Sequence, residues 1–166
     1  MSAIITLLDG RVIDILDPKP EDIKIEDIAN ALSKLCRFNG IIKDFYSVAQ
    51  HCCSCVDMAV SEGVSDKKKL LALLLHDASE AYCGDVIRPL KVLLGETYSI
   101  IEGRFEDVIE KALNVEIYRN KEFIKNYDNR IIYREKQLKD SVRFVCWDHN
   151  RSYLEYMNYY KGLTNE

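Results

Sequence analysis

The pattern of apolar and polar positions divides the chain into a short β-type segment and a long helical one. Residues 3–8 and 11–15 are apolar runs rich in β-branched side chains, and they flank Asp9-Gly10, a dipeptide that tolerates the positive φ angles of a two-residue turn. From residue 22 onward the apolar positions recur with helical period, beginning with Ile25, Ile28, Ala29, Leu32 and Leu35. The pattern predicts a β-hairpin followed by helices.

Cap residues and apolar runs place the remaining helices. Ser47 is a favourable N-cap before a stripe of small and apolar residues, and Asp66 can cap the next helix. Residues 70–75 are apolar on every face, so we expect that helix at the centre of the fold. A loop with Gly84 and Pro89 follows, and further helices are predicted over 98–113, 126–138 and about 150–160.

Together these elements predict an all-α helical bundle with a small N-terminal β-hairpin. One domain over residues 1–166 is expected, with the hairpin at 3–15, a helical core at 22–138 and a C-terminal helical extension at 139–160. A chain of 166 residues with 48% hydrophobic residues can bury one ordinary core. The sequence has no internal repeat or low-complexity tract that argues for another architecture.

Charge and cysteine usage exclude several classes of function. The net charge of −4 disfavours a nucleic acid polymer as partner, because such binding draws on a clustered basic surface. The N-terminus has no basic segment followed by an apolar run, so we expect no signal peptide, no membrane and a cytoplasmic protein. The six cysteines are interpreted as reduced thiols, because the chain is not a small secreted scaffold.

Two residue clusters are better explained by packing than by chemistry. Cys52 and Cys55 are predicted to pack as small apolar residues, because no second Cys/His pair completes a metal knuckle, and Cys53 is predicted to be exposed. A set of tyrosines recurs at helical spacing near the C-terminus, which indicates a packing or oligomer face: Tyr153, Tyr156, Tyr159 and Tyr160.

Polar chemistry follows directly on the most apolar helix. His76-Asp77 comes after six consecutive apolar residues, with Glu80 four residues after His76 and Asp85 in a turn that contains Gly84. A structural His-Asp hydrogen bond or a helix end emerging into solvent would also explain the doublet. Three carboxylates beside one imidazole repel one another unless a cation is bound, and nitrogen plus oxygen ligands suit Zn, Mn, Co or Fe.

The motifs resemble a known family. Residues 45–51 (FYSVAQH), residues 76–85 (HDASEAYCGD) with residues 89–91 (PLK), and Tyr127-Asp128 before a charged helix are similar to the ordered H…HD…D pattern of the HD-domain phosphohydrolases. Within that family they resemble the 5′-deoxynucleotidase branch and the related phage-type deoxynucleoside triphosphatases. Residues 25–29 and 35–40 fit the same group, so the resemblance covers most of the chain to about residue 138.

The resemblance implies a metal site and its ligands. It assigns four residues as ligands of a divalent metal ion: His51, His76, Asp77 and Asp128. A histidine on an apolar helix is more often a core residue, and an aspartate at a predicted helix start is more often an N-cap. Glu80 would be the acid/base or water-orienting group, and Asp85 a second candidate beside the attacking water.

The same resemblance suggests substrate contacts. Arg37 would offer a planar fork to phosphate and Lys91 a point charge, although a solvated surface charge is the usual role of either residue considered alone. Phe38 stands where the family's deoxynucleotidases typically carry a Trp that packs near the sugar, which implies a preference for deoxyribose. Magnesium could accompany the substrate phosphates.

The expected function is metal-dependent hydrolysis of a small-molecule deoxynucleotide. The products would be deoxynucleoside and triphosphate from a dNTP, or deoxynucleoside and phosphate from a dNMP. One alternative is a non-catalytic sensor of nucleotide or metal that keeps the site for binding, and another is a structural helical protein that binds no metal. The family resemblance also implies a homo-oligomer, a dimer or a larger assembly.

Overall fold

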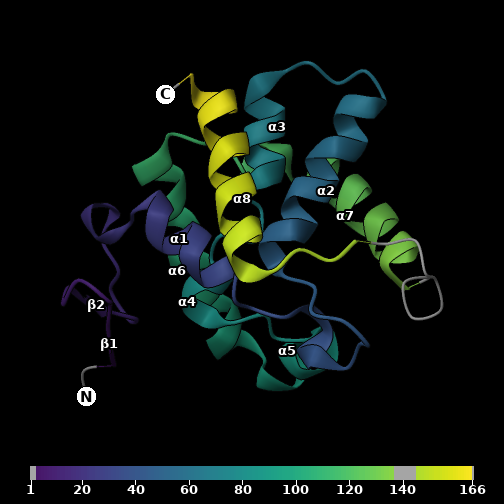
Figure 1. Ribbon diagram of the computed structural model, residues 1–166. Helices are drawn as coiled ribbons and strands as arrows, with labels where there is room; N and C mark the ends of the chain where they lie inside the picture. Colours follow the sequence, from purple (N-terminus) through teal and green to yellow (C-terminus); the bar gives the residue numbers. More distant parts are fainter. Residues whose placement is uncertain (1–2, 137–144, 166) are drawn as a thin grey trace.

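The chain folds into helices around a buried core, with one small antiparallel sheet at its N-terminal end (Figure 1). The computed structural model describes residues 3–136 and 145–165, without the side chains of residues 134 and 136. The elements in chain order are β1 (Ile4–Thr6), β2 (Val12–Asp14), η1 (Pro20–Asp22), α1 (Ile25–Leu32), η2 (Arg37–Gly40), α2 (Val48–Ser61), α3 (Lys67–Leu74), α4 (Glu80–Cys83), α5 (Arg88–Leu94), α6 (Glu96–Leu113), η3 (Tyr118–Asn120), α7 (Lys121–Lys136) and α8 (His149–Thr164).

The predicted hairpin is confirmed, with a longer turn than expected. Strand β1 pairs with β2 so that Ile5 lies opposite Ile13, and Ile13 is fully buried. The Leu7 backbone N–H donates to the Arg11 carbonyl, which leaves three residues in the loop instead of two. Gly10 has φ +82°, a backbone conformation that costs glycine little.

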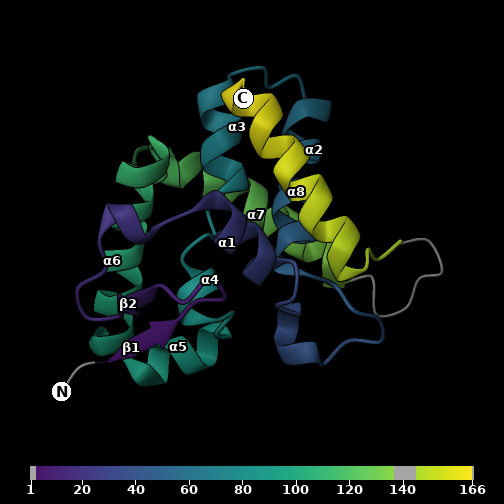
Figure 2. The ribbon, with the colours of Figure 1, turned by 60° about the vertical axis from the view of Figure 1, so that its left-hand side comes forward.

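Three helices form the centre of the molecule. Helices α2, α3 and α8 pack on one another, while α7 flanks α2 and α1 contacts α8 (Figure 1). Residues 70–74 of α3 are all buried, as their uninterrupted apolar character predicts. Figure 2 shows the hairpin at the opposite end of the molecule from the C-terminus. No helix in the described part of the chain has the length and apolar character needed to cross a bilayer.

Helix α3 ends before the His-Asp doublet. Asp66 caps its start by accepting hydrogen bonds from the backbone N–H groups of Lys68 and Lys69, and its last residue is Leu74. A turn then carries His76 and Asp77 to α4, which begins at Glu80. Glu80 is therefore not on a continuation of the apolar helix.

Helix α7 begins earlier than predicted, at Lys121 instead of residue 126. Polar residues at its start hid the apolar stripe, which already includes Ile124. Asp128 consequently lies in the middle of a helix, so the N-cap explanation for it is wrong. Residues 137–138 of the predicted core and 139–144 of the predicted extension lie outside the described residues.

The segment expected to be a loop around Gly84 and Pro89 contains two short helices. Pro89 lies in the first turn of α5, where its missing N–H costs no helical hydrogen bond. Gly84 has φ +78° and ends α4. This segment therefore reverses the chain between α4 and α6 with helical turns instead of an extended loop.

The packing predictions are confirmed except at one cysteine. Cys52 and Cys55 are buried in the core, but Cys53 is also fully buried, which contradicts its predicted exposure. Cys53 is buried because α2 packs against three other helices, α3, α7 and α8. Among the C-terminal tyrosines, Tyr156 and Tyr160 pack in the core.

Candidate metal centre

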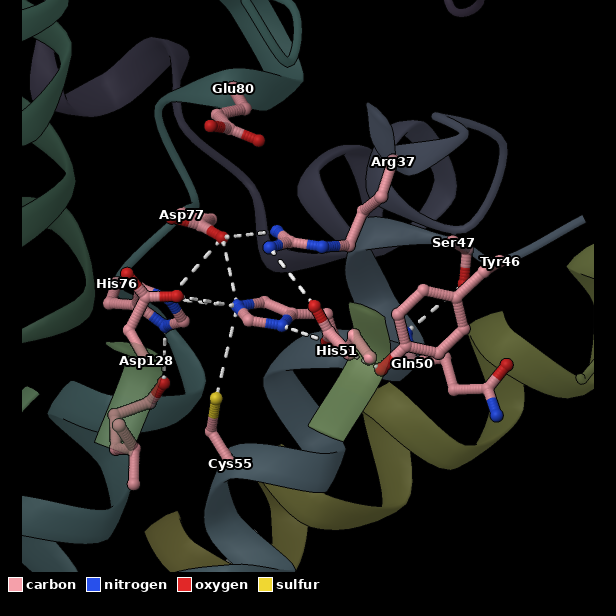
Figure 3. Close-up of polar contacts among 12 residues, drawn as sticks. Arg37, Tyr46, Ser47, Gln50, His51, Cys55, His76, Asp77, Glu80 and Asp128 are labelled. Carbon is pink, nitrogen blue, oxygen red and sulfur yellow. Dashed lines mark hydrogen bonds and ion pairs between the residues drawn. The ribbon is translucent and has the colours of Figure 1, made fainter. Parts of the chain in front are cut away.

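His51 lies at the centre of a group of polar side chains that come from α2, α7, η2, α4 and the turn after α3 (Figure 3). Ser47 fixes the start of α2 by accepting a hydrogen bond from the backbone N–H three residues later, and His51 follows in the first turn, fully buried. Its Nε2 atom lies 3.4 Å from Nε2 of His76. The carboxylate atoms Oδ2 of Asp77 and Oδ1 of Asp128 lie 3.5 and 3.2 Å from the same atom. Three of the predicted ligands therefore lie within 3.5 Å of one nitrogen of the fourth, His51.

The turn after α3 sets the orientation of His76. Its Nδ1 atom lies 2.7 Å from the carbonyl oxygen of Leu73 and can only donate to that acceptor. The lone pair of neutral His76 is therefore on Nε2, which faces His51 and lies 3.3 Å from Oδ2 of Asp77. The backbone itself thus presents this imidazole in the form that binds a metal.

The spacing of these atoms fits a shared cation. Nitrogen and oxygen ligands bound at about 2.0–2.2 Å, at tetrahedral or octahedral angles, lie about 3.0–3.5 Å from one another. The four contacts just given, at 3.2–3.5 Å, fall in that range. Two imidazole nitrogens that face each other with lone pairs would repel without a positive charge between them. The arrangement could therefore hold a metal ion.

The electrostatics of this point also favour a cation. Burial alone would lower the pKa of His51, but its anionic neighbours, which include Glu135 and Asp128, raise that pKa well above its usual range. Burial opposes ionisation of Asp128 as well, yet the hydrogen bond from His51 and the charge of His76 lower its pKa to about 2. A metal ion bound here would take the place of a proton on His51.

Two cysteines lie beside this group. Ligand atoms of His51, Cys55 and His76 lie within 4.8 Å of one another, as do those of Cys52, His76 and Asp77. Cys55 Sγ is 3.8 Å from His51 Nε2, farther than either carboxylate. Burial raises the pKa of the Cys52 and Cys55 thiols, which keeps them protonated. Histidine and carboxylate are therefore the nearer and more available ligands.

Glu135 is a site residue that the sequence analysis missed. Its side chain is 1% exposed, and Oε1 accepts hydrogen bonds from His51 Nδ1 at 2.6 Å and from the Tyr46 hydroxyl at 2.8 Å. Burial opposes its ionisation, but the charges of His51 and Arg37 and these hydrogen bonds lower its pKa. Among the described residues it is the last member of the buried stripe of α7, which includes Ile124 and Ile131. This helical period was the sequence signal that could have identified it.

Arg37 is buried, so it is not a solvated surface charge. A backbone hydrogen bond from Arg37 to the Tyr46 carbonyl, 2.9 Å long, holds it beside the start of α2. Its guanidinium lies 3.5 Å from Asp77 Oδ2 and 3.4 Å from Glu135 Oε2. Phe38 has φ 57°, a left-handed conformation unusual for a large residue, and its ring centre is 5.4 Å from the guanidinium.

Glu80 is a buried carboxyl group at the edge of the cluster. Burial first, and then the charges of Asp77 and Asp85, raise the pKa of Glu80 to about 9 against the opposing effect of Lys91. Its Oε2 atom has no hydrogen-bond partner among the side chains that the structure describes. Asp85 is half-buried, and burial raises its pKa too, partly offset by Arg37. Glu80 is thus protonated at neutral pH when no cation is bound.

Lys91 reaches the cluster from α5. Its ammonium group lies 3.7 Å from Glu80 Oε1 and 2.7 Å from Oε1 of Glu102 on α6. It also lies 5.5 Å from the centre of the Tyr98 ring. Lys91 is therefore held by α6 at the position where its charge acts on Glu80.

A cavity opens against the other side of the centre. Its volume is about 230 Å³, and both His76 and Asp128 line it. The remaining lining comes from α6, from α7 and from the segment between them, and it includes Tyr118, Lys121 and Lys125. A small molecule in this cavity would touch two of the four converging side chains.

Comparison with known proteins gives relatives but no family. No family model matches the chain. It is 41% identical over 102 residues to an uncharacterized protein of Rhodobacter capsulatus, covering 59% of this chain and 52% of that protein. It is 43% identical over 91 residues to the uncharacterized protein YfdR of Escherichia coli K12, covering 55% of this chain and 47% of YfdR. The chain thus spans about half the length of the curated relatives it matches.

Proposed function

We propose that the chain is a metal-dependent phosphohydrolase of the HD-domain class that acts on deoxynucleotides. The observation that carries the proposal is the convergence of one imidazole, that of His76, and two carboxylates on Nε2 of His51, at the spacing of ligands to one cation. A buried, protonated carboxyl group, Glu80, lies next to this point and is suited to proton transfer. A site built only for stability has no need of both features.

Four residues would hold the ion: His51, His76, Asp77 and Asp128. Their mixture of nitrogen and oxygen atoms suits Zn, Mn, Co or Fe, and Mg could accompany the substrate phosphates. When bound, such an ion supplies a Lewis acid for the phosphoryl group and lowers the pKa of water. Hydrolysis of a phosphate ester needs both effects together with a proton for the leaving group.

The chain's own residues supply the proton transfers and the positioning. Glu80, whose pKa is raised by burial, can carry a proton and donate it to the leaving-group oxygen. Asp85, half-buried beside it, can take a proton from the attacking water. Lys91 lies 3.7 Å from Glu80, so a phosphate placed at Glu80 is within reach of this ammonium. Arg37 already balances Asp77 and Glu135, and its contact with phosphate remains a proposal from the family resemblance.

The cavity beside His76 and Asp128 is proposed to admit the substrate. Lys121 and Lys125 are exposed at its wall and could contact a phosphate, but Glu106, Asp107 and Glu110 line the same cavity, so entry of an anionic substrate would depend on the charge of the bound metal ion. Phe38, beside Arg37, is proposed to contact the deoxyribose. The homo-oligomer implied by the resemblance belongs to the same proposal, and light scattering of the purified protein tests it.

The proposal is tested with a panel of deoxynucleotides. Purified protein loaded with Mn, Co or Zn should hydrolyse a dNMP or a dNTP, and a chelator should abolish the activity. Glu80→Gln removes the transferable proton and keeps the shape of the side chain, so kcat should fall by about 10²–10⁴-fold. Asp17→Ala, at an exposed residue paired with Lys19, is the matched control and should leave kcat unchanged.

The products decide between the versions of the proposal. With dAMP and dATP as substrates, release of phosphate indicates a monophosphatase, and release of triphosphate indicates a triphosphohydrolase. Tight nucleotide binding without turnover would favour the hypothesis of a non-catalytic sensor over that of an enzyme. Elemental analysis that finds no metal in protein purified with added zinc would contradict both.

A further inference from the structure

Glu135 carries a carboxylate in a buried position, where an ionised group is energetically unfavourable. Its side chain is 1% exposed, and taking a carboxylate out of water costs several kcal/mol unless partners compensate it. Its neighbours in the buried stripe of α7, Ile124, Tyr127 and Ile131, are apolar or aromatic. An apolar residue would complete the stripe at no such cost. The carboxylate must therefore serve the groups it contacts.

The contact with His51 selects one form of that imidazole. A neutral imidazole carries a single N–H, so an acceptor 2.6 Å from Nδ1 holds the proton on that nitrogen. The lone pair is then on Nε2, the atom that faces His76, Asp77 and Asp128. A carboxylate in this position also increases the electron density of the ring and strengthens Nε2 as a ligand.

A second contact extends the influence of Glu135 to Asp77. One terminal nitrogen of Arg37 lies 3.4 Å from Glu135 Oε2, and the other lies 3.5 Å from Asp77 Oδ2. The Tyr46 hydroxyl, 2.8 Å from Oε1, holds the carboxylate from the opposite side. Figure 3 shows the guanidinium of Arg37 beside Asp77 and above the ring of His51 in that view. Glu135 is thus connected to two of the four converging side chains.

We infer that Glu135 is a positioning residue of the metal site, which holds His51 with its proton on Nδ1 and, through Arg37, orients Asp77. The inference deepens the proposed function and rests on it, because it requires a metal ion at His51. Glu135 touches neither the ion nor the substrate in this role. Its removal should therefore weaken metal binding and change the imidazole of His51, while the helices stay in place.

Glu62 provides a matched control for the substitution. It also connects α2 to α7, accepting hydrogen bonds from the Tyr127 hydroxyl at 3.2 Å and from Arg130 Nη1 at 3.0 Å. Glu62→Gln and Glu135→Gln therefore make the same chemical change between the same two helices. Glu135 differs from Glu62 in its contact with a proposed ligand, His51 Nδ1, at 2.6 Å.

The experiment measures zinc affinity by competition with a chelator, without using activity. Glu135→Gln should weaken zinc binding by about 10–100-fold, the usual cost of losing such a carboxylate, and Glu62→Gln should change it by less than about two-fold. The second readout is the NMR signal of the Nδ1 proton of His51 in zinc-loaded protein with labelled histidine. This signal should lie far downfield in the wild type and in Glu62→Gln, and it should move upfield in Glu135→Gln.

Each outcome decides the inference. If Glu135→Gln folds and keeps both the zinc affinity and the proton signal of the wild type, the role is refuted. If Glu135→Gln does not fold, we would use Tyr46→Phe, which keeps the carboxylate of Glu135 and removes one of its hydrogen bonds. A several-fold loss of zinc affinity in Tyr46→Phe supports the role of Glu135, and an unchanged affinity refutes it. Wild-type protein that binds no zinc refutes the proposed function and this role together, whereas zinc binding insensitive to Glu135 refutes only the role.

Discussion

Two arginines in this protein each bridge two carboxylates, but in very different surroundings. Arg11 connects the hairpin to α1: its Nε lies 2.6 Å from Asp9, a terminal nitrogen contacts Asp27, and the other donates to the Asp22 carbonyl at 2.7 Å. Arg37 lies 3.5 and 3.4 Å from its two carboxylates, and its Nε has no hydrogen-bond acceptor among the described side chains.

The difference separates a structural ion pair from the candidate metal site. Around Arg11 the donors and acceptors are matched at short distance, and the side chain is 26% exposed. Around Arg37 the contacts are long, the side chain is 9% exposed, and buried atoms of Glu80 and Glu135 have no hydrogen-bond partner among the described residues. Carboxylates outnumber cations in the second cluster. A cation bound in such a cluster would reduce the repulsion among its carboxylates, which fits the proposed metal site.

The largest expected difference between the clusters is that between two single variants, each of which replaces one aspartate by alanine. Asp77→Ala should lower metal affinity and deoxynucleotide hydrolysis by at least about 10³-fold, because it removes a proposed ligand and a partner of Arg37. Asp27→Ala should leave both unchanged and lower only the melting temperature. Chelator competition, a hydrolysis assay and thermal unfolding measure the three quantities. Equal effects of the two variants on metal affinity would remove the distinction between the clusters.

The second effect is a pH dependence of the free energy of unfolding, which we expect from Glu80 and His51 of the Arg37 cluster and not from the Arg11 cluster. Without metal, the folded chain keeps the proton on Glu80 up to about pH 9, whereas the unfolded chain releases it near its ordinary value of 4.5. The folded state therefore binds more protons between these values, and the free energy of unfolding falls as the pH rises. His51, whose pKa is also raised, acts in the same direction.

Urea unfolding of metal-free protein between pH 6 and pH 8.5 measures this slope. We expect a loss on the order of 1 kcal/mol per pH unit in the wild type. Glu80→Gln should have a clearly smaller slope, while Asp27→Ala should keep that of the wild type. A wild-type slope that Glu80→Gln does not alter would show that Glu80 is ionised in the folded state.

The smallest effect is expected at Arg11. Arg11→Met keeps much of the aliphatic stem and removes the charge, so it should lower the melting temperature by about 2–4 °C, the effect of a partly exposed ion pair. The difference should shrink in high salt, because salt screens exposed charges. Metal affinity should not change. A loss of metal affinity in Arg11→Met would connect the hairpin to the site and contradict the separation drawn here.

Apolar stripes with helical period made much of the fold predictable, and α7 shows the limit of this kind of prediction. The prediction began this helix at residue 126 and gave an N-cap as the alternative role of the proposed ligand Asp128, because the first turn is polar. The buried stripe continues to Glu135, a charged residue that a search for apolar positions rejects. Helical period identified the face of α7, but only the packed structure revealed that a carboxylate belongs to it.

The sequence predicted only part of the candidate site, because some of its features depend on how the chain packs. The ordered motifs marked His51, His76, Asp77 and Asp128, and the structure brings these residues together. The burial of Arg37 could not be predicted, because it depends on the backbone bridge between Cys36 and Ser47 that places it beside α2. The break after Leu74, which separates Glu80 from the apolar helix, was hidden by a helical spacing that continues across it.

The sequence by itself determined the helices, the hairpin and the residue types that can bind a cation, because periodicity and side-chain chemistry are local properties. The tertiary structure decided which atoms of those residues face one another. Only packing of α7 on α2 brings Glu135 to Nδ1 of His51 across 84 residues of chain, and so fixes which nitrogen points to the centre. The form of an imidazole is set by its neighbours in space, and those neighbours are distant in sequence.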